Sequence, residues 1–233
     1  MAVDVDRKVL LYSGGLDSFI LRYTYHFDEV VYFDVGTDDS KREMERLDKR
    51  VTIVQFPLKQ FELANKIIPF RNYLFTMLAA NFGNRITIGA TLGDTTRDKD
   101  RVFQSLCGAM LNYFGSVDEK MPYKATYFEV DMPFKNLTKT EIIRDWLQNF
   151  GHRKELLKDS RSCYAGGRTE CGKCRSCLRK YVAFKNNDIE DLLDFAAPTQ
   201  AQLVHLYEES VVKHRHPKEL QEIVYCYSPK ELK

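Results

Sequence analysis

Short apolar runs alternate with segments of helical periodicity along the first half of the chain. The runs are bounded by turn residues, as buried strands are, and they cover residues 8–12, 29–34, 51–56, 85–90 and 126–130. Helices are expected between them over residues 17–26, 39–50, 72–82 and 100–114. This alternation predicts an α/β fold, with a doubly wound, mostly parallel five-stranded sheet and helices on both faces. Ligands of such sheets bind at the carboxyl ends of the strands, where the strand order reverses.

The pattern changes at about residue 137, where helices and a cysteine-rich loop replace the alternation. We expect an α/β domain over 1–136, a helical zinc-binding region over 137–187 and a helical C-terminal extension over 188–233. Pro198 precedes Thr199, which is the expected N-cap of a helix beginning at residue 200. Apolar residues at helical spacing in the extension are expected to pack on their own domain rather than on a partner; they are Leu203, Leu206, Tyr207 and Val211.

Composition and charge exclude several classes of protein. The chain has 233 residues, of which 44% are hydrophobic and 29% charged, so it can bury a core without disulfides. Its formal charge of +2 does not favour nucleic-acid or membrane-surface binding. No apolar run reaches the ~18 residues of a membrane span, and the N-terminus lacks a secretory-signal pattern. We therefore expect a cytoplasmic protein, in which cysteines bind metal or lie in the core rather than form disulfides.

A Gly-Gly turn joins the first expected strand to the first expected helix, in the string Ser13, Gly14, Gly15, Leu16, Asp17 and Ser18. Glycines let the backbone approach a ligand closely, and N–H groups of the turn and of the helix N-terminus bind phosphate oxygens. Ser13 and Ser18 can add hydroxyl donors, and Asp17 can hold a magnesium ion or its water ligands. A turn followed by a Ser/Asp helix cap is the alternative that needs no ligand.

Four cysteines form a C-x7-C-x2-C-x2-C pattern; they are Cys163, Cys171, Cys174 and Cys177. Four thiolates suit tetrahedral zinc and leave no open coordination position, which predicts a structural zinc site. An iron–sulfur cluster also accepts four thiolates and is the alternative. Basic residues around the cluster are expected to offset its charge; they are Arg168, Lys173, Arg175, Arg179 and Lys180. The isolated Cys107 and Cys226 are expected to be small buried residues.

The Gly-Gly string and the late four-cysteine pattern together resemble the 7-cyano-7-deazaguanine synthase family. Further strings agree with its motifs: P-F-R-N at 69–72, G-A-T-L-G-D at 89–94 with Thr91 in place of Asn, L-T-K-T-E-I at 137–142, S-C-Y at 162–164 and C-G-K-C-R-S-C at 171–177. The resemblance covers roughly residues 8–187. Residues 138–141 also fit a helix capping box, a reading that needs no function for Lys139.

The resemblance implies the fold and chemistry of the N-type ATP pyrophosphatases, in the adenine nucleotide alpha-hydrolase-like superfamily. It implies an ATP-dependent ligase of the queuosine pathway that forms a C–N bond. Its small-molecule partners would be ATP with Mg²⁺, 7-carboxy-7-deazaguanine and ammonia, and its product 7-cyano-7-deazaguanine, reached through an adenylated acid and an adenylated amide. A homodimer is an option, since family members often dimerise.

Roles for individual residues follow from this reaction. Ser13, Gly14, Gly15 and Ser18 are expected to bind the phosphates. Asp17 and Asp94 are expected to hold or orient magnesium, and Lys139 and Arg71 to offset charge that develops on the phosphates.

Two loops and the tail depart from the family pattern. Residues 34–39 read D-V-G-T-D-D, residues 98–101 read D-K-D-R, and a helical extension from about residue 188 replaces a short tail. These segments are expected to face the nucleobase or to close over it. Alternatives are therefore a related enzyme that uses another acid, stops at an amide or conjugates another amine, an enzyme that thiolates tRNA with Cys107 as its nucleophile, or a non-catalytic nucleotide- or RNA-binding zinc module.

Overall fold

The computed structural model describes residues 6–115, 127–163 and 169–227. The chain divides into two compact units. The first contains Met1–Gly14, Leu21–Ala90 and Thr96–Pro133, and the second contains Gly15–Ile20, Thr91–Thr95 and Phe134–Lys233. Two short segments of the α/β half of the sequence thus belong with the C-terminal half. The domain boundaries expected at residues 136 and 187 stay a prediction.

The first unit is built on a five-stranded sheet in which every neighbouring pair is parallel. Its strands are β1 (Lys8–Leu11), β2 (Glu29–Asp34), β3 (Thr52–Gln55), β4 (Arg85–Ile88) and β5 (Glu129–Asp131). Their spatial order is β3-β2-β1-β4-β5, which confirms the doubly wound α/β fold and places the reversal between β1 and β4. Thr126, at the start of the fifth expected strand, lies outside the described residues.

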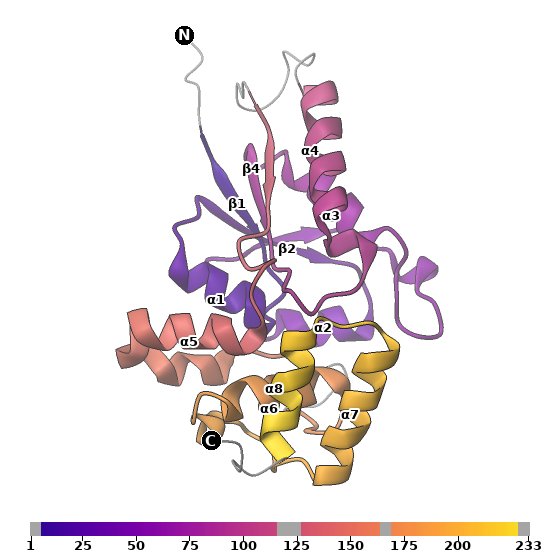
Figure 1. Cartoon of the computed structure of the whole chain (residues 1–233). Helices are drawn as coiled ribbons and strands as arrows, with labels where there is room; N and C mark the ends of the chain where they lie inside the picture. The colour runs from indigo at the N-terminus through magenta and orange to yellow at the C-terminus, as the bar shows by residue number, and fades with distance from the viewer. Residues whose placement is uncertain (1–5, 116–126, 164–168, 228–233) are drawn as a thin grey trace. The chain divides into compact units, whose positions relative to one another are not determined.

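The connections place helices on both faces of this sheet. Its helices are α1 (Leu16–Thr24), α2 (Asp38–Met44), α3 (Arg71–Ala79) and α4 (Arg101–Gly115), with short 3-10 turns η1 (Lys59–Phe61) and η2 (Arg97–Lys99). The connections that contain α1 and α2 carry the chain across the sheet toward the β3 edge. The connections that contain α3 and α4 carry it toward the β5 edge. Right-handed crossovers in opposite directions put the two pairs on opposite faces. Figure 1 shows α3 and α4 side by side, as their contacts require.

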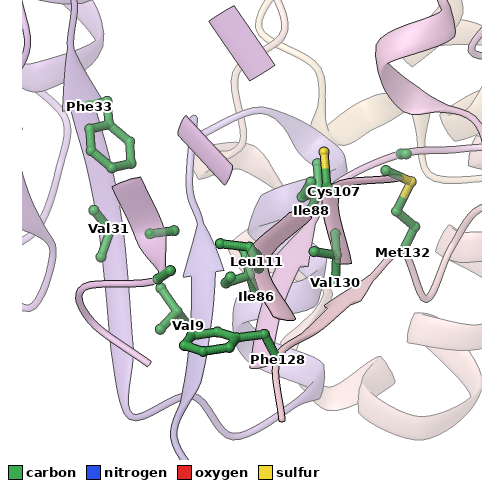
Figure 2. Packing of buried hydrophobic residues seen from close by; sticks show 13 residues of the cluster. Val9, Val31, Phe33, Ile86, Ile88, Cys107, Leu111, Phe128, Val130 and Met132 are labelled. Carbon is green, nitrogen blue, oxygen red and sulfur yellow. The ribbon is translucent and has the colours of Figure 1, made fainter. Parts of the chain in front are cut away.

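Alternate strand residues form the core under α3 and α4, because successive side chains of a strand point to opposite faces. Val9 and Ile86 are fully buried there, and Leu111 of α4 packs beside Ile86 (Figure 2). At the end of α4, a side chain at Gly115 would collide with the ring of Phe128. Cys107 lies in the same cluster, as expected of a small core residue.

The polar helix expected over residues 39–50 ends early. It stops at Met44, and the following segment turns instead. Asp48 accepts a hydrogen bond from the backbone N–H of Arg50 (2.8 Å) and another from the guanidinium of Arg22. Aspartate commonly forms such local turns in competition with helix, and this is why helical spacing alone overestimated the length.

The second unit is helical. It contains α5 (Lys139–Phe150), α6 (Arg175–Lys185), α7 (Gln200–Val212) and α8 (Pro217–Tyr227), with 3-10 segments η3 (Gly151–Asp159) and η4 (Glu190–Leu192). Thr199 caps α7 as predicted, and Thr138 and Glu141 form a complete capping box at α5. None of the helices in the described ranges is long and apolar enough to cross a membrane.

The C-terminal extension packs within its own unit. Leu203 and Leu206 of α7 join Leu178 of α6 and Ile223 of α8 in one buried cluster. Figure 1 shows α7 and α8 side by side at the yellow end of the chain. Three of the four apolar positions predicted to pack inward, Tyr207 included, belong to this cluster, whereas Val211 is 43% exposed.

We expect Leu111→Ala to lower the free energy of unfolding by about 2–5 kcal/mol, because it leaves a cavity under α4. Leu106→Ala is the matched control, since the same substitution falls on the same helix at a side chain that is 60% exposed. Its effect should stay within about 0.5 kcal/mol. Urea denaturation of both variants measures the difference, and equal losses would contradict the assigned packing of α4.

Candidate functional site

The Gly-Gly turn follows β1 and leads directly into α1. Gly14 has a φ of +69°, and an added Cβ would meet no other atom within 4 Å, so the turn requires glycine for its conformation and not for space. Ser18 is buried and donates a hydrogen bond to the carbonyl oxygen of Gly15 (3.1 Å). Ser13 is exposed, whereas the Leu16 side chain is buried, so Leu16 has only its backbone to offer a ligand.

Asp17 and Lys139 form an ion pair, although they are 122 positions apart in the sequence. Asp17 lies in the first turn of α1, where the helix dipole favours a negative charge. Lys139 is the first residue of α5, directly after the N-cap Thr138. Only 16% of the Asp17 side chain and 13% of the Lys139 side chain are exposed. Two of the predicted catalytic residues therefore meet in a largely buried pair.

Asp94 ends a tight turn whose backbone is held by a lysine. The N–H of Thr91 donates to Oδ2 of Asp94 (3.0 Å), and the N–H of Asp94 donates to the carbonyl oxygen of Thr91 (3.1 Å). The ammonium of Lys135 donates to the carbonyl oxygens of the same two residues, each at 3.2 Å. The guanidinium of Arg179 approaches Oδ1 of Asp94 at 3.5 Å. Asp94 is thus fixed by its own turn and faces a buried cation.

Asp17, Asp94, Lys139 and Arg179 act on one another, and we call these four residues the charge cluster. Burial lowers the pKa of the Lys139 ammonium, and the Arg179 charge adds to this effect, while the carboxylates of Asp17 and Asp94 oppose it. Burial acts to lower the pKa of Arg179 too, but the carboxylates of Glu219, Asp94 and Asp17 outweigh it and raise that pKa. The cluster therefore combines acids and cations that depend on each other for their charged state.

Basic residues beside the cysteines have carboxylate partners. Arg179 pairs with Glu219 and Asp94, Lys180 pairs with Glu170 at 2.6 Å, and Arg175 pairs with Glu209 at 3.4 Å. These three charges have carboxylate partners, and their expected role in offsetting the thiolates stays a prediction. Arg168 lies outside the described residues. In the sequence, Arg179 is distinguished only by its position two residues after Cys177, which is why its place in the charge cluster was missed.

Arg71, the fourth predicted catalytic residue, lies in the first unit. It begins α3. Burial raises the pKa values of Tyr32 and Glu43, and the charge of Arg71 opposes this rise without cancelling it. The next residue, Asn72, donates a hydrogen bond to Oδ2 of Asp98 (2.8 Å). The P-F-R-N string and the divergent D-K-D-R string therefore meet in space, which their separation in the sequence did not reveal.

The divergent loop after β2 folds onto its own acid. Asp34 is 5% exposed, and its Oδ1 accepts hydrogen bonds from the N–H of Gly36 (2.9 Å) and the hydroxyl of Ser40 (2.7 Å). Burial acts to raise the pKa of Asp34, but these two donors, with a further hydrogen bond from Gln55 and the charge of Lys41, outweigh it and lower that pKa. Thr37 caps α2 by accepting from the N–H of Ser40. This aspartate therefore shapes the loop.

The four predicted cysteines converge, with all four sulfur atoms within 4.8 Å of one another. The Sγ of Cys177 lies 3.4 Å from that of Cys174 and 3.9 Å from that of Cys171. Four sulfurs bound to one tetrahedral ion by bonds of ~2.3 Å would lie about 3.8 Å apart. Backbone N–H groups, including that of Cys171 to the Sγ of Cys163 (3.4 Å), donate to the sulfurs and favour their ionised form. The arrangement fits a metal site.

Comparisons with known proteins agree with these motifs. The model of the family "Queuosine biosynthesis protein QueC" matches residues 43–188. The chain is 31% identical to 7-cyano-7-deazaguanine synthase of Methanosarcina mazei, over 80% of this chain and 97% of that protein. It is 25% identical to 7-cyano-7-deazaguanine synthase 2 of Sulfurisphaera tokodaii, over 82% of this chain, and it spans only about half of that protein (48%).

Among solved structures, the chain is similar to the U34-tRNA thiolase NcsA from Methanococcus maripaludis with its [4Fe-4S] cluster. The TM-score is 0.38 and the identity 13%, over 97% of this chain and 73% of that one. A similarity this weak carries no argument about function.

We expect the purified protein to hold about one metal ion per chain and Cys177→Ser to lose it. Loss of the metal should destabilise the protein by several kcal/mol, because binding at a structural site contributes directly to folding. Cys226→Ser is the control, since it makes the same change on α8, outside the four cysteines. Metal analysis and thermal melts of both variants measure this. Full metal retention in Cys177→Ser would refute the assignment.

Proposed function

This chain belongs to the family of queuosine biosynthesis protein QueC, and from that premise we propose that it converts 7-carboxy-7-deazaguanine and ammonia into 7-cyano-7-deazaguanine with ATP. The observation that carries the proposal is the charge cluster, in which Asp17, Lys139 and Asp94 converge beside the helix that follows a Gly-Gly turn. Two acids and two cations at a helix N-terminus suit a magnesium–triphosphate. This arrangement supports adenylation as the common step.

The proposed chemistry uses one ATP site twice. A carboxylate is a poor electrophile because its leaving group would be oxide, so transfer of AMP to it supplies a stable leaving group and releases pyrophosphate. Ammonia displaces AMP and gives the amide. A second AMP transfer to the amide oxygen lets AMP leave as the nitrile forms. Each round consumes one ATP, and neither requires a nucleophilic side chain from the protein.

The phosphate-binding turn and each member of the charge cluster have a proposed task in the transfer of AMP. Backbone N–H groups of residues 14–18 bind phosphate oxygens, together with the hydroxyl of Ser13 and with that of Ser18 once it turns away from the carbonyl oxygen of Gly15. Asp17 and Asp94 hold or orient the magnesium ion. Lys139 and Arg179 stabilise the negative charge that develops on the phosphates as the bond between the α- and β-phosphates breaks. Arg71 belongs to the first unit, and its expected task stays a prediction.

We propose zinc as the metal of the four cysteines. A single ion brings all its ligands close to one centre, whereas an iron–sulfur cluster binds each cysteine to a different iron and so spreads the sulfurs farther apart. Sulfur atoms that all lie within 4.8 Å of one another support the single ion. Four protein ligands leave no position for substrate, so the ion has a structural role.

Thiolation of tRNA has little support from the chain's own residues. Cys107, the candidate nucleophile, is 2% exposed and lies in the core under α4. Burial raises the pKa of its thiol to about 11, so at neutral pH it carries almost none of the reactive thiolate.

We expect the nitrile mass when the protein is incubated with ATP, magnesium, ammonium and 7-carboxy-7-deazaguanine and the products are read by mass spectrometry. AMP should accumulate in step with the product. An amide mass would restrict the enzyme to the first round and favour the amide-forming alternative. Neither AMP nor product would overturn the proposed substrate.

We expect Asp17→Asn to lower kcat/KM by roughly 100-fold or more, because it removes the charge that would hold magnesium beside the phosphates. Asp145→Asn is the matched control, since it makes the same change at an exposed residue of α5. Initial rates of AMP release give the comparison, and circular dichroism verifies folding. Unchanged activity in a folded Asp17→Asn protein would remove Asp17 from the mechanism.

A further inference from the structure

The turn between α7 and α8 brings two further charged residues to the charge cluster. Arg215 lies in that turn and Glu219 in the first turn of α8, and both are buried, with exposures of 8% and 5%. Both lie beyond residues 43–188, the part of the chain that the family model matches. They belong to the same unit as Asp17, Asp94, Lys139 and Arg179.

Glu219 sets the direction of the Arg179 guanidinium. Its Oε1 accepts from Nε of Arg179 at 2.8 Å and lies 2.7 Å from Nη2, so two of the three guanidinium nitrogens face Glu219. The third nitrogen, Nη1, faces Asp94. Because the guanidinium is planar and rigid, the hydrogen bond at Nε and the close approach of the carboxylate to Nη2 determine where Nη1 lies.

Arg215 holds the turn that carries Asp94. Its Nη1 donates to the carbonyl oxygen of Gly93 and to Oε2 of Glu219, the latter at 3.1 Å. A Cβ on Gly93 would collide with the Glu219 carboxylate, so the two segments are in close contact. The backbone of the Asp94 turn is thus held by Lys135 on one pair of carbonyls and by Arg215 on another carbonyl.

We propose that Arg215 and Glu219 are positioning residues of the ATP site: Glu219 aims Arg179, and Arg215 fixes Gly93, so that Arg179 and Asp94 meet the magnesium–triphosphate in one orientation. This inference rests on the proposed ATP-dependent function. It gives the C-terminal extension a task in the reaction beyond packing against α6.

A purely structural role makes a different prediction. If Glu219 served only to attach α8, its removal would lower stability and leave the turnover of the folded protein unchanged. If it acts through Arg179, removing Glu219 must matter only while Arg179 is present. A double-mutant cycle separates the two cases.

The cycle uses full-length wild type, Glu219→Gln, Arg179→Gln and the double variant. We expect Glu219→Gln to lower kcat/KM roughly tenfold, as is common for residues that orient a functional ligand. In the Arg179→Gln background the same change should cost nothing more. Glu209→Gln is the control, since it removes a glutamate that pairs with Arg175 on the same extension, and its activity should equal that of wild type.

Binding of magnesium with α,β-methylene-ATP, measured by calorimetry, gives a readout that does not depend on the acid substrate. We expect Glu219→Gln to weaken this binding and the double variant to match Arg179→Gln. Equal affinity and turnover in wild type and Glu219→Gln, or additive losses in the cycle, would overturn this inference and leave the proposed ATP-dependent function intact. Failure of wild type to bind the analogue would instead overturn the proposed ATP-dependent function. If Glu219→Gln does not fold, Glu219→Asp, which keeps the charge and shortens its reach, enters the same cycle.

Discussion

The second unit is constrained above all by charges that it buries. An unpaired charge in a protein interior is so costly that removing one partner of a buried pair typically costs about 3–5 kcal/mol. Arg179, Glu219 and Arg215 satisfy this constraint only together, because Glu219 lies between two cations and Arg179 lies between two acids. In the folded protein, segments from distant parts of the sequence must therefore all be in place for these charges to be paired. The same requirement keeps the Asp94 turn and α8 together.

The metal site and the charge cluster are connected through one helix. Cys174 is the N-cap of α6, Cys177 lies in its first turn, and Arg179 follows two residues later. A metal bound by these cysteines fixes the start of α6 and with it the point from which the Arg179 side chain extends. Lys180, the next residue, is anchored by Glu170 and by the carbonyl oxygen of Ser160 (2.7 Å). A structural metal can in this way support a site to which it supplies no chemistry.

The sheet could be predicted from the sequence because its evidence is local. Each buried parallel strand is a short apolar run, and the order of strands and helices follows from counting these runs. The cysteine cluster was equally accessible, since three of its four ligands lie within seven residues. Arg179, Arg215 and Glu219 could not be assigned in advance, because their partners are far away in the sequence and their own surroundings resemble an ordinary polar helix surface. The length of α2 was overestimated for the opposite reason, a local side-chain bond at Asp48 that competes with helix.

Lys139 shows how a local and a distant role can coincide. The capping box of Thr138 and Glu141 explains this string without any function for Lys139, yet the capping box and the Lys139–Asp17 ion pair are both present. The cap fixes where α5 begins, and Lys139 is the first residue after the cap, so the cap sets the position from which the Lys139 side chain reaches Asp17. A change of helix start by one residue would rotate this position by about 100° around the helix axis and separate the pair. The capping box is therefore a condition for the ion pair. The same Thr138–Glu141 motif that needs no function for Lys139 also helps to place Lys139 in the charge cluster.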